Sequence, residues 1–136
     1  MRIIVIDGQG GGIGRSMVER LRLEAPNAEI IAVGTNSLAT SAMIKAGANA
    51  GATGENAVVY NCAHADVIAG PVGILLANSM LGEITEKMAL AVSESRAEKV
   101  LIPVCKCHVR IAGMEDKPIS KYIEEAVAVI RQIAGV

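Results

Sequence analysis

The residues best suited to chemistry are five glycines within the seven positions Gly8 to Gly14, in the stretch IDGQGGGIGRSM. They follow the apolar run Ile3–Ile6, which predicts a buried strand, and they open a predicted helix over 12–23. Glycines allow a sharp turn and let a phosphate approach the amides at the start of a helix. The stretch predicts a site for a nucleotide or another phosphate-bearing ligand, and a purely structural turn is the alternative. The predicted binding residues are Asp7, Gly8, Gln9, Gly10, Gly11, Gly12, Ile13, Gly14, Arg15 and Ser16.

Two glycine spacings compete within this stretch. The pattern G-x-G-x-x-G fails because Ile13 stands where a small residue is required, whereas G-x-x-x-G-x-G fits Gly8, Gly12 and Gly14. In that form the stretch resembles the cofactor loop of short-chain dehydrogenases/reductases, and this resemblance, which covers about residues 2–36, implies that the glycine stretch binds a nucleotide. The resemblance brings no catalytic pair, because neither Tyr60 nor Tyr122 is followed four positions later by the lysine of that family.

The segment after the second predicted strand, Glu29–Val33, bears on the choice of nucleotide. It reads Gly34, Thr35, Asn36, Ser37 and contains no acid that would bind a ribose as NAD-binding proteins do. Hydroxyl and amide groups at the start of a helix suit a phosphate, so the sequence predicts NADP in preference to NAD. Asp7 places a negative charge beside the proposed phosphates, and bracing the loop through backbone amides is its alternative role.

All three cysteines and both histidines lie in two short segments, Cys62-Ala63-His64 and Cys105-Lys106-Cys107-His108. Both segments are expected after strands at one sheet edge, where thiolates and imidazoles would suit zinc. The spacings are not those of standard zinc sites, however, and nothing indicates a redox thiol. Zinc is therefore not expected, although a metal- or redox-sensing protein stays an alternative.

The segment GPVGILLANSMLGEIT, Gly70–Thr85, is apolar apart from Asn78, Ser79 and Glu83. Asn78 and Ser79 are predicted to contact the ligand at the carboxyl side of the fourth strand. The apolar side chains Ile74, Leu75, Met80 and Leu81 predict a helix packed in a homodimer interface. The stretch ATGEN, Ala52–Asn56, is expected to form a turn before the third strand.

Composition limits the partners of this chain of 136 residues. A net charge of −1 and two tyrosines as the only aromatic residues argue against nucleic acid. No apolar run is long enough to span a bilayer, and the cysteines follow no disulfide pattern, so no membrane partner and a reduced, cytoplasmic location are expected. With 51% hydrophobic residues and no Phe or Trp, the core must consist of aliphatic side chains.

Strands and helices are expected to alternate, which predicts an α/β chain with a mainly parallel sheet in a three-layer, Rossmann-like fold over residues 1–136. Ligands of such sheets bind at the carboxyl ends of the strands. The expected strands are Arg2–Ile6, Glu29–Val33, Ala57–Tyr60, Asp66–Ala69, Lys99–Val104 and a short one over His108–Ala112, and the expected helices are Gly12–Leu23, Ser37–Ala46, Thr85–Arg96 and Ile119–Ile133.

Four segments, IDGQGGGIGR, GTNSLATSAMIKAGA, GATGEN and GPVGILLANSMLGEIT, together resemble a family of small bacterial proteins that is a domain of unknown function. The resemblance spans most of the chain and implies a Rossmann-like protein without supplying a reaction. We therefore predict a small cytoplasmic nucleotide-binding protein. A small NADPH-dependent reductase using Asn78, Ser79 or His64 for proton transfer is the enzymatic alternative.

Overall fold

The computed structural model describes residues 1–104 and 108–136, which form five strands, five α-helices and one short 3₁₀ helix. The five strands make one parallel sheet in the order β3-β2-β1-β4-β5, which confirms the predicted α/β architecture. The elements are β1 (Arg2–Asp7), α1 (Gly12–Glu24), β2 (Glu29–Gly34), α2 (Ser37–Lys45), β3 (Ala50–Thr53), α3 (Glu55–Cys62), β4 (Val67–Pro71), η1 (Val72–Leu75), α4 (Glu86–Glu94), β5 (Glu98–Ile102) and α5 (Ile119–Ala134).

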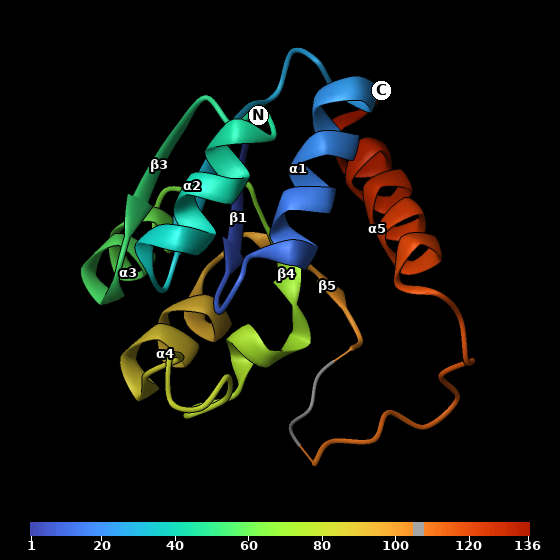
Figure 1. The fold of residues 1–136 in the computed structure, drawn as a ribbon. Coiled ribbons are helices and arrows are strands. Elements are labelled where there is room, and N and C mark those ends of the chain that lie inside the picture. Colours follow the sequence, from blue (N-terminus) through green and yellow to red (C-terminus); the bar gives the residue numbers. More distant parts are fainter. Residues whose placement is uncertain (105–107) are drawn as a thin grey trace.

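The helices lie in two layers on either side of the sheet (Figure 1). Helices α1, α2 and α5 share one apolar core with one face of the sheet, and η1, α3 and α4 share a second core with the other face. The chain builds outward from β1 to β2 and β3, then crosses to β4 and β5 on the other side of β1. The direction of winding thus reverses between β1 and β4, and ligands of such sheets bind at that reversal.

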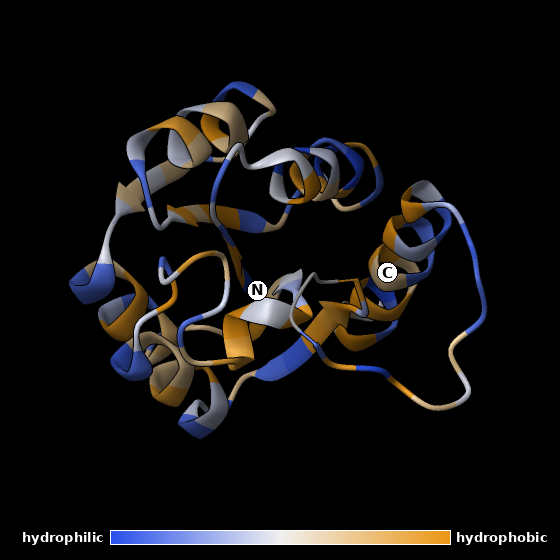
Figure 2. Cartoon of the chain, turned by 60° about the horizontal axis from the view of Figure 1, so that its bottom comes forward, coloured by the Kyte–Doolittle hydropathy of each residue, from blue (hydrophilic) through white to orange (hydrophobic). Residues whose placement is uncertain are grey.

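The centre of the sheet shows how an aliphatic sequence forms two cores. Along β1, Ile3 and Val5 belong to one core while Ile4 and Ile6 belong to the other, and all four are fully buried. Because β1 is covered on both faces, it reads as a continuous apolar run instead of an alternating one. Figure 2 shows the same arrangement, with apolar colour on the central strands and polar colour mainly on peripheral loops and helix ends.

The third strand was predicted in the wrong place. Ala57–Tyr60 belongs to helix α3, whereas the strand is Ala50–Thr53, at the edge of the sheet. The segment ATGEN accordingly ends β3 and begins α3. An edge strand of small residues carries little apolar signal, and Val58 and Cys62, four positions apart, are the buried face of the helix.

Two other predicted elements are also absent from the described chain. The residues of His108–Ala112 are irregular, and they lie in the long loop that leads to α5 (Figure 1). The segment Gly70–Thr85 forms no α-helix, because it contains η1 followed by a series of turns. Ile74 is fully buried in the core and is not available to a dimer interface, whereas Leu81 is 97% exposed.

Candidate functional site

Three loops meet at Gly8, at the carboxyl end of β1. A Cβ placed on Gly8 would lie 2.6 Å from Oγ1 of Thr35, 2.7 Å from Sδ of Met80 and 2.9 Å from Oε1 of Glu83. These three side chains come from the loops after β2 and β4. Any residue larger than glycine would push the loops apart, so Gly8 is required for their convergence.

Glu83 joins these loops through one carboxylate oxygen. Its Oε1 accepts hydrogen bonds from the backbone N–H of Gln9 at 2.8 Å, from Oγ1 of Thr35 at 2.5 Å and from Nδ2 of Asn36 at 3.0 Å. These bonds, that from Thr35 foremost, lower the pKa of Glu83 below its usual value. Glu83 therefore stands as a carboxylate at the end of β2, where the sequence alone showed no acid.

Asn36 holds two loops in place at once. Its Oδ1 accepts the N–H of Ala39 at 2.9 Å and so caps α2. Its Nδ2 donates to the carbonyl oxygen of Gln9 at 2.9 Å as well as to Glu83. The start of α2 is thereby fixed against the glycine loop.

Asp7 braces the glycine loop from beneath, which confirms the alternative role predicted for it. The side chain is only 5% exposed, and its two oxygens accept the N–H groups of Gly8 at 2.8 Å and Gly14 at 2.7 Å. Burial raises the pKa of Asp7, and the two backbone hydrogen bonds oppose that rise. The amides of Gly8, Gln9 and Gly14 thus already have protein acceptors.

The residues Asn78–Glu83, which we name the strap, carry Met80 and Glu83 to the glycine loop. Asn78, Met80 and Leu81 have φ values of 67°, 57° and 56°, a left-handed conformation that side chains other than glycine seldom adopt. The strap is closed at its base by a hydrogen bond of 2.7 Å from the N–H of Asn78 to the carbonyl oxygen of Ile84, the residue that follows the strap. Such backbone strain is typical of functional loops.

A crevice of about 510 Å³ opens beside the strap, between the carboxyl ends of β1 and β4. Its position is the reversal point of the sheet, and its volume is ordinary for a small-molecule site. The walls are mostly apolar, with the hydroxyl of Ser79 and the carboxyl of Asp7 among the polar groups. The lining residues are Asp7, Gly8, Gln9, Ile13, Pro71, Gly73, Ser79, Met80, Leu81 and Val104.

The structure distributes the predicted site residues over separate places. Asp7, Gly8, Gln9, Ile13 and Ser79 line the crevice, while Thr35 and Asn36 bind Glu83 beside it. A second hollow, between α1 and α2, is lined by Gly10, Arg15 and Ser37 among others. Ser16 faces a third, between α1 and α5, and Asn78 is exposed on the strap.

Three of the predicted binding glycines serve close packing. A Cβ on Gly11 would lie 2.8 Å from Cα of Ala39, and one on Gly14 would lie 2.6 Å from Sδ of Met43. A Cβ on Gly34 would meet Thr40 at 2.3 Å. By contrast, a Cβ on Gly12 meets nothing within 4 Å, so Gly12 has open space before it.

The predicted cluster of cysteines and histidines is not assembled. Cys62 and His64 lie just before β4, at the amino end of the sheet, whereas His108 follows β5 at the carboxyl end. A strand of five residues separates these ends by about 16 Å. Burial raises the pKa of the Cys62 thiol to about 11, so it is a poor nucleophile. Within residues 1–104 and 108–136 no three potential ligands are grouped to hold a metal; Cys105 and Cys107 lie outside the described residues.

The role of Glu83 and the apolar walls of the crevice were not predicted from the sequence. Glu83 lies 74 positions from Gln9 and 48 from Thr35, so no local pattern pairs them. The one sequence feature that pointed to Glu83 was its place as the single acid in the mostly apolar segment Gly70–Thr85. Pro71, Met80, Leu81 and Val104 show no feature that distinguishes them from core residues.

A comparison with protein families shows to which family the chain belongs. The family described as a domain of unknown function, DUF3842, matches residues 2–135. The chain belongs to the DUF3842 family. This confirms the whole-length resemblance; a bacterial origin and the likeness of the glycine loop to short-chain dehydrogenases stay predictions. No curated protein matches the chain.

Among solved structures, the chain is similar to a dodecameric FMN-dependent UbiX-like decarboxylase from Escherichia coli O157:H7. The identity is 17%, the match covers 100% of this chain and 96% of the other, and the TM-score is 0.45. Within the described residues, no helix combines the length and the apolar composition that crossing a bilayer requires.

The prediction of NADP or NAD as the cofactor is wrong. The UbiX-like decarboxylase, one of the solved structures to which the chain is similar, is described as dependent on FMN. In addition, Thr35 and Asn36 hydrogen-bond the Glu83 carboxylate, so the groups assigned to a 2′-phosphate already have an anionic partner. A phosphate placed there would be repelled by that carboxylate.

Proposed function

We propose that DUF3842 proteins of this kind bind a small phosphate-bearing molecule of mononucleotide size in the crevice between β1 and β4. The observation that carries the proposal is the position of this crevice, which lies at the reversal point of a parallel sheet and against the first turn of α1. In open parallel sheets the ligand site is expected at that point. The volume of about 510 Å³ suits one small ligand.

The phosphate is assigned to the amides of Gly12 and Ile13. These are first-turn N–H groups of α1 and have no acceptor within the helix, whereas Gly14 donates to Asp7. Gly12 is exposed and Ile13 lines the crevice, so an anion can approach both. The helix dipole adds a favourable interaction with a negative charge at this point.

The remainder of the ligand is assigned to the apolar walls. Pro71 and Gly73 supply one wall from β4 and η1, and Met80 and Leu81 supply another from the strap. A Cβ on Gly73 would lie 3.3 Å from Oγ of Ser79, so the strap packs closely against η1 at that point. Such a slot suits a ring or another flat apolar group joined to the phosphate.

Charge reversal at Gly12 tests this assignment. The variant Gly12→Asp has room for its side chain and places a carboxylate beside the proposed phosphate, while Gly12→Asn has nearly the same shape without the charge. With FMN and AMP as probes in calorimetric titrations, we expect at least one to bind the wild-type chain. We expect its affinity to be about tenfold or more lower in Gly12→Asp than in Gly12→Asn.

Two outcomes would contradict the proposal. One is that neither FMN nor AMP binds the wild-type chain at millimolar concentration. The other is that Gly12→Asp and Gly12→Asn bind the probe equally well. Circular dichroism and thermal unfolding show that both variants are folded. Weaker binding by Gly12→Asp then reports the loss of the phosphate contact and not unfolding of the chain.

A further inference from the structure

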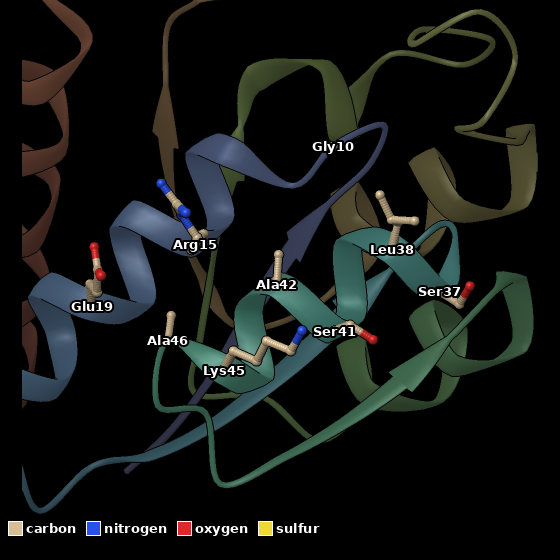
Figure 3. A pocket seen from close by; sticks show the side chains of 9 residues that line it. All are labelled: Gly10, Arg15, Glu19, Ser37, Leu38, Ser41, Ala42, Lys45 and Ala46. Atoms are coloured by element: carbon tan, nitrogen blue, oxygen red, sulfur yellow. The ribbon is translucent and has the colours of Figure 1, made fainter.

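The hollow between α1 and α2 is separate from the crevice and has a volume of about 570 Å³. Figure 3 shows its side chains projecting from two adjacent helices, with Gly10 on the loop at one end. The crevice lining shares no residue with it. We name this hollow the helix groove; its lining residues are Gly10, Arg15, Glu19, Ser37, Leu38, Ser41, Ala42, Lys45 and Ala46.

The helix groove has one cation on each wall. Arg15 projects from α1 and Lys45 from the last turn of α2, and both side chains are exposed. Within residues 1–104 and 108–136 neither cation lies within ion-pair distance of a carboxylate. Arg20, the next basic residue of α1, is by contrast paired with Glu24. The cations of the groove are therefore available to an anion from outside.

Hydroxyl donors accompany these cations on α2. Ser37, Ser41 and Lys45 are spaced four residues apart and so share one face of the helix, and in Figure 3 the Lys45 ammonium points toward Ser41. Glu19 is the one acid among the lining residues, which leaves a net charge of +1. Guanidinium, ammonium and hydroxyl groups are donors that suit phosphate oxygens, and Ser41 is the hydroxyl nearer Lys45, because Ser37 lies more than two helical turns from it along α2.

We propose that the helix groove binds a phosphate group, either as the free dianion or as a phosphate monoester. The exposed side chain of Leu38, at 71% exposure, and the methyl group of Ala42 give the groove an apolar flank that suits the carbon part of an ester. This site is independent of the crevice and of the ligand proposed there.

The test is a ¹H–¹⁵N NMR titration of the full chain with inorganic phosphate and, separately, with glycerol 3-phosphate, against sodium chloride at equal ionic strength. We expect saturable shifts of the amides around Ser37, Ser41 and Lys45. The variant Arg15→Gln/Lys45→Gln is expected to weaken this binding about tenfold or more. The matched control Lys87→Gln/Arg96→Gln removes two exposed cations elsewhere and is expected to bind as the wild type does.

Two further variants separate this site from the crevice. Glu19→Gln removes the acid of the groove and is expected to tighten phosphate binding. Ile13→Glu places a negative charge in the crevice, and the groove isotherm is expected to stay unchanged. If the ester binds more tightly than inorganic phosphate, the carbon part contributes; if not, the free anion is the ligand.

The proposal is overturned if neither probe gives saturable shifts near Ser41, or if Arg15→Gln/Lys45→Gln binds like the wild type. It is also overturned if shifts are confined to the Gly12 region and disappear in Ile13→Glu, because the phosphate then binds only in the crevice.

Discussion

At the scale of single residues, the site depends on a carboxylate and a glycine that are far apart in the sequence. Glu83 accepts hydrogen bonds from two other loops, and Gly8 gives its side chain room to reach them. Asp7 holds the same glycine loop from the side of the sheet. Both carboxylates thus accept hydrogen bonds that hold the loops in place, and the amides of Gly12 and Ile13 are the ones proposed to bind the ligand.

The space at Gly8 leads to a stability prediction. Gly8→Ala is expected to lower the free energy of unfolding by about 1–3 kcal/mol, because the new methyl group would overlap Thr35, Met80 and Glu83. Gly10→Ala is the matched control, since a Cβ there meets nothing within 4 Å and the change is expected to stay within about 0.5 kcal/mol. Urea unfolding of both variants measures the difference, and equal stabilities would refute the convergence of loops at Gly8.

The carboxylate of Glu83 gives a pH prediction. Because hydrogen bonds lower its pKa in the folded chain, its contribution to stability is present above the unfolded pKa of about 4.3 and is lost as the pH falls through the lower folded value. Glu83→Gln is expected to cost about 1 kcal/mol near pH 7. The difference between wild type and variant should shrink steadily below about pH 4.

Burial raises the pKa of Asp7 in the folded chain, so the contribution of Asp7 to the free energy of unfolding changes with pH in the opposite direction to that of Glu83. It favours the folded state as the pH falls, because the protonated carboxyl is the form that burial favours. Comparing wild type with Glu83→Gln at each pH removes this contribution from the measurement. Glu94→Gln, at an exposed position, serves as the control. A wild-type minus Glu83→Gln difference that is constant from pH 3 to pH 7, by chemical denaturation, would be evidence against the Glu83 network.

At the scale of elements, the cap residue of α2 hydrogen-bonds to the site, while the side chain of the cap residue of α4 bonds within its own helix. Asn36 caps α2 and also reaches Gln9 and Glu83, whereas Thr85 caps α4 by accepting the N–H of Met88 at 3.1 Å. Both Asn36→Ala and Thr85→Ala should therefore lose about 1 kcal/mol of stability. Only Asn36→Ala should also weaken binding of FMN or AMP, because it alone loosens the glycine loop.

Urea unfolding together with calorimetry distinguishes the two effects. If Thr85→Ala weakens ligand binding as much as Asn36→Ala does, the link between α2 and the crevice is wrong, and the loss is then a general result of lower stability.

Element prediction from the sequence succeeded where one periodicity dominated. The solid apolar run of β1 and the spaced apolar residues of α5 were predicted nearly to their ends. It failed at Ala57–Tyr60, because a helix with a narrow buried face and a short edge strand of small residues give similar local patterns. The strap could not be predicted, since three of its four left-handed residues, Asn78, Met80 and Leu81, are not glycines.

At the scale of the whole molecule, the parallel sheet and its two aliphatic cores follow from the sequence, while the contacts of the site depend on the order of strands. That order places β4 beside β1 and so brings the strap to the glycine loop. The same order places Cys62 and His64 at the end of the sheet away from the crevice. The predicted homodimer stays a prediction, with Leu81 as its remaining exposed contact.

Native mass spectrometry tests the central claim most directly, since it reports bound ligand and subunit number together. The freshly purified chain, and the chain incubated with FMN or AMP, are compared with the denatured mass. In the Arg15→Gln/Lys45→Gln background, which removes the cations of the helix groove, we predict one FMN or AMP bound per chain, retained with Gly12→Asn and lost with Gly12→Asp. A wild-type spectrum without added mass under every condition would contradict the account and make the glycine loop a structural turn.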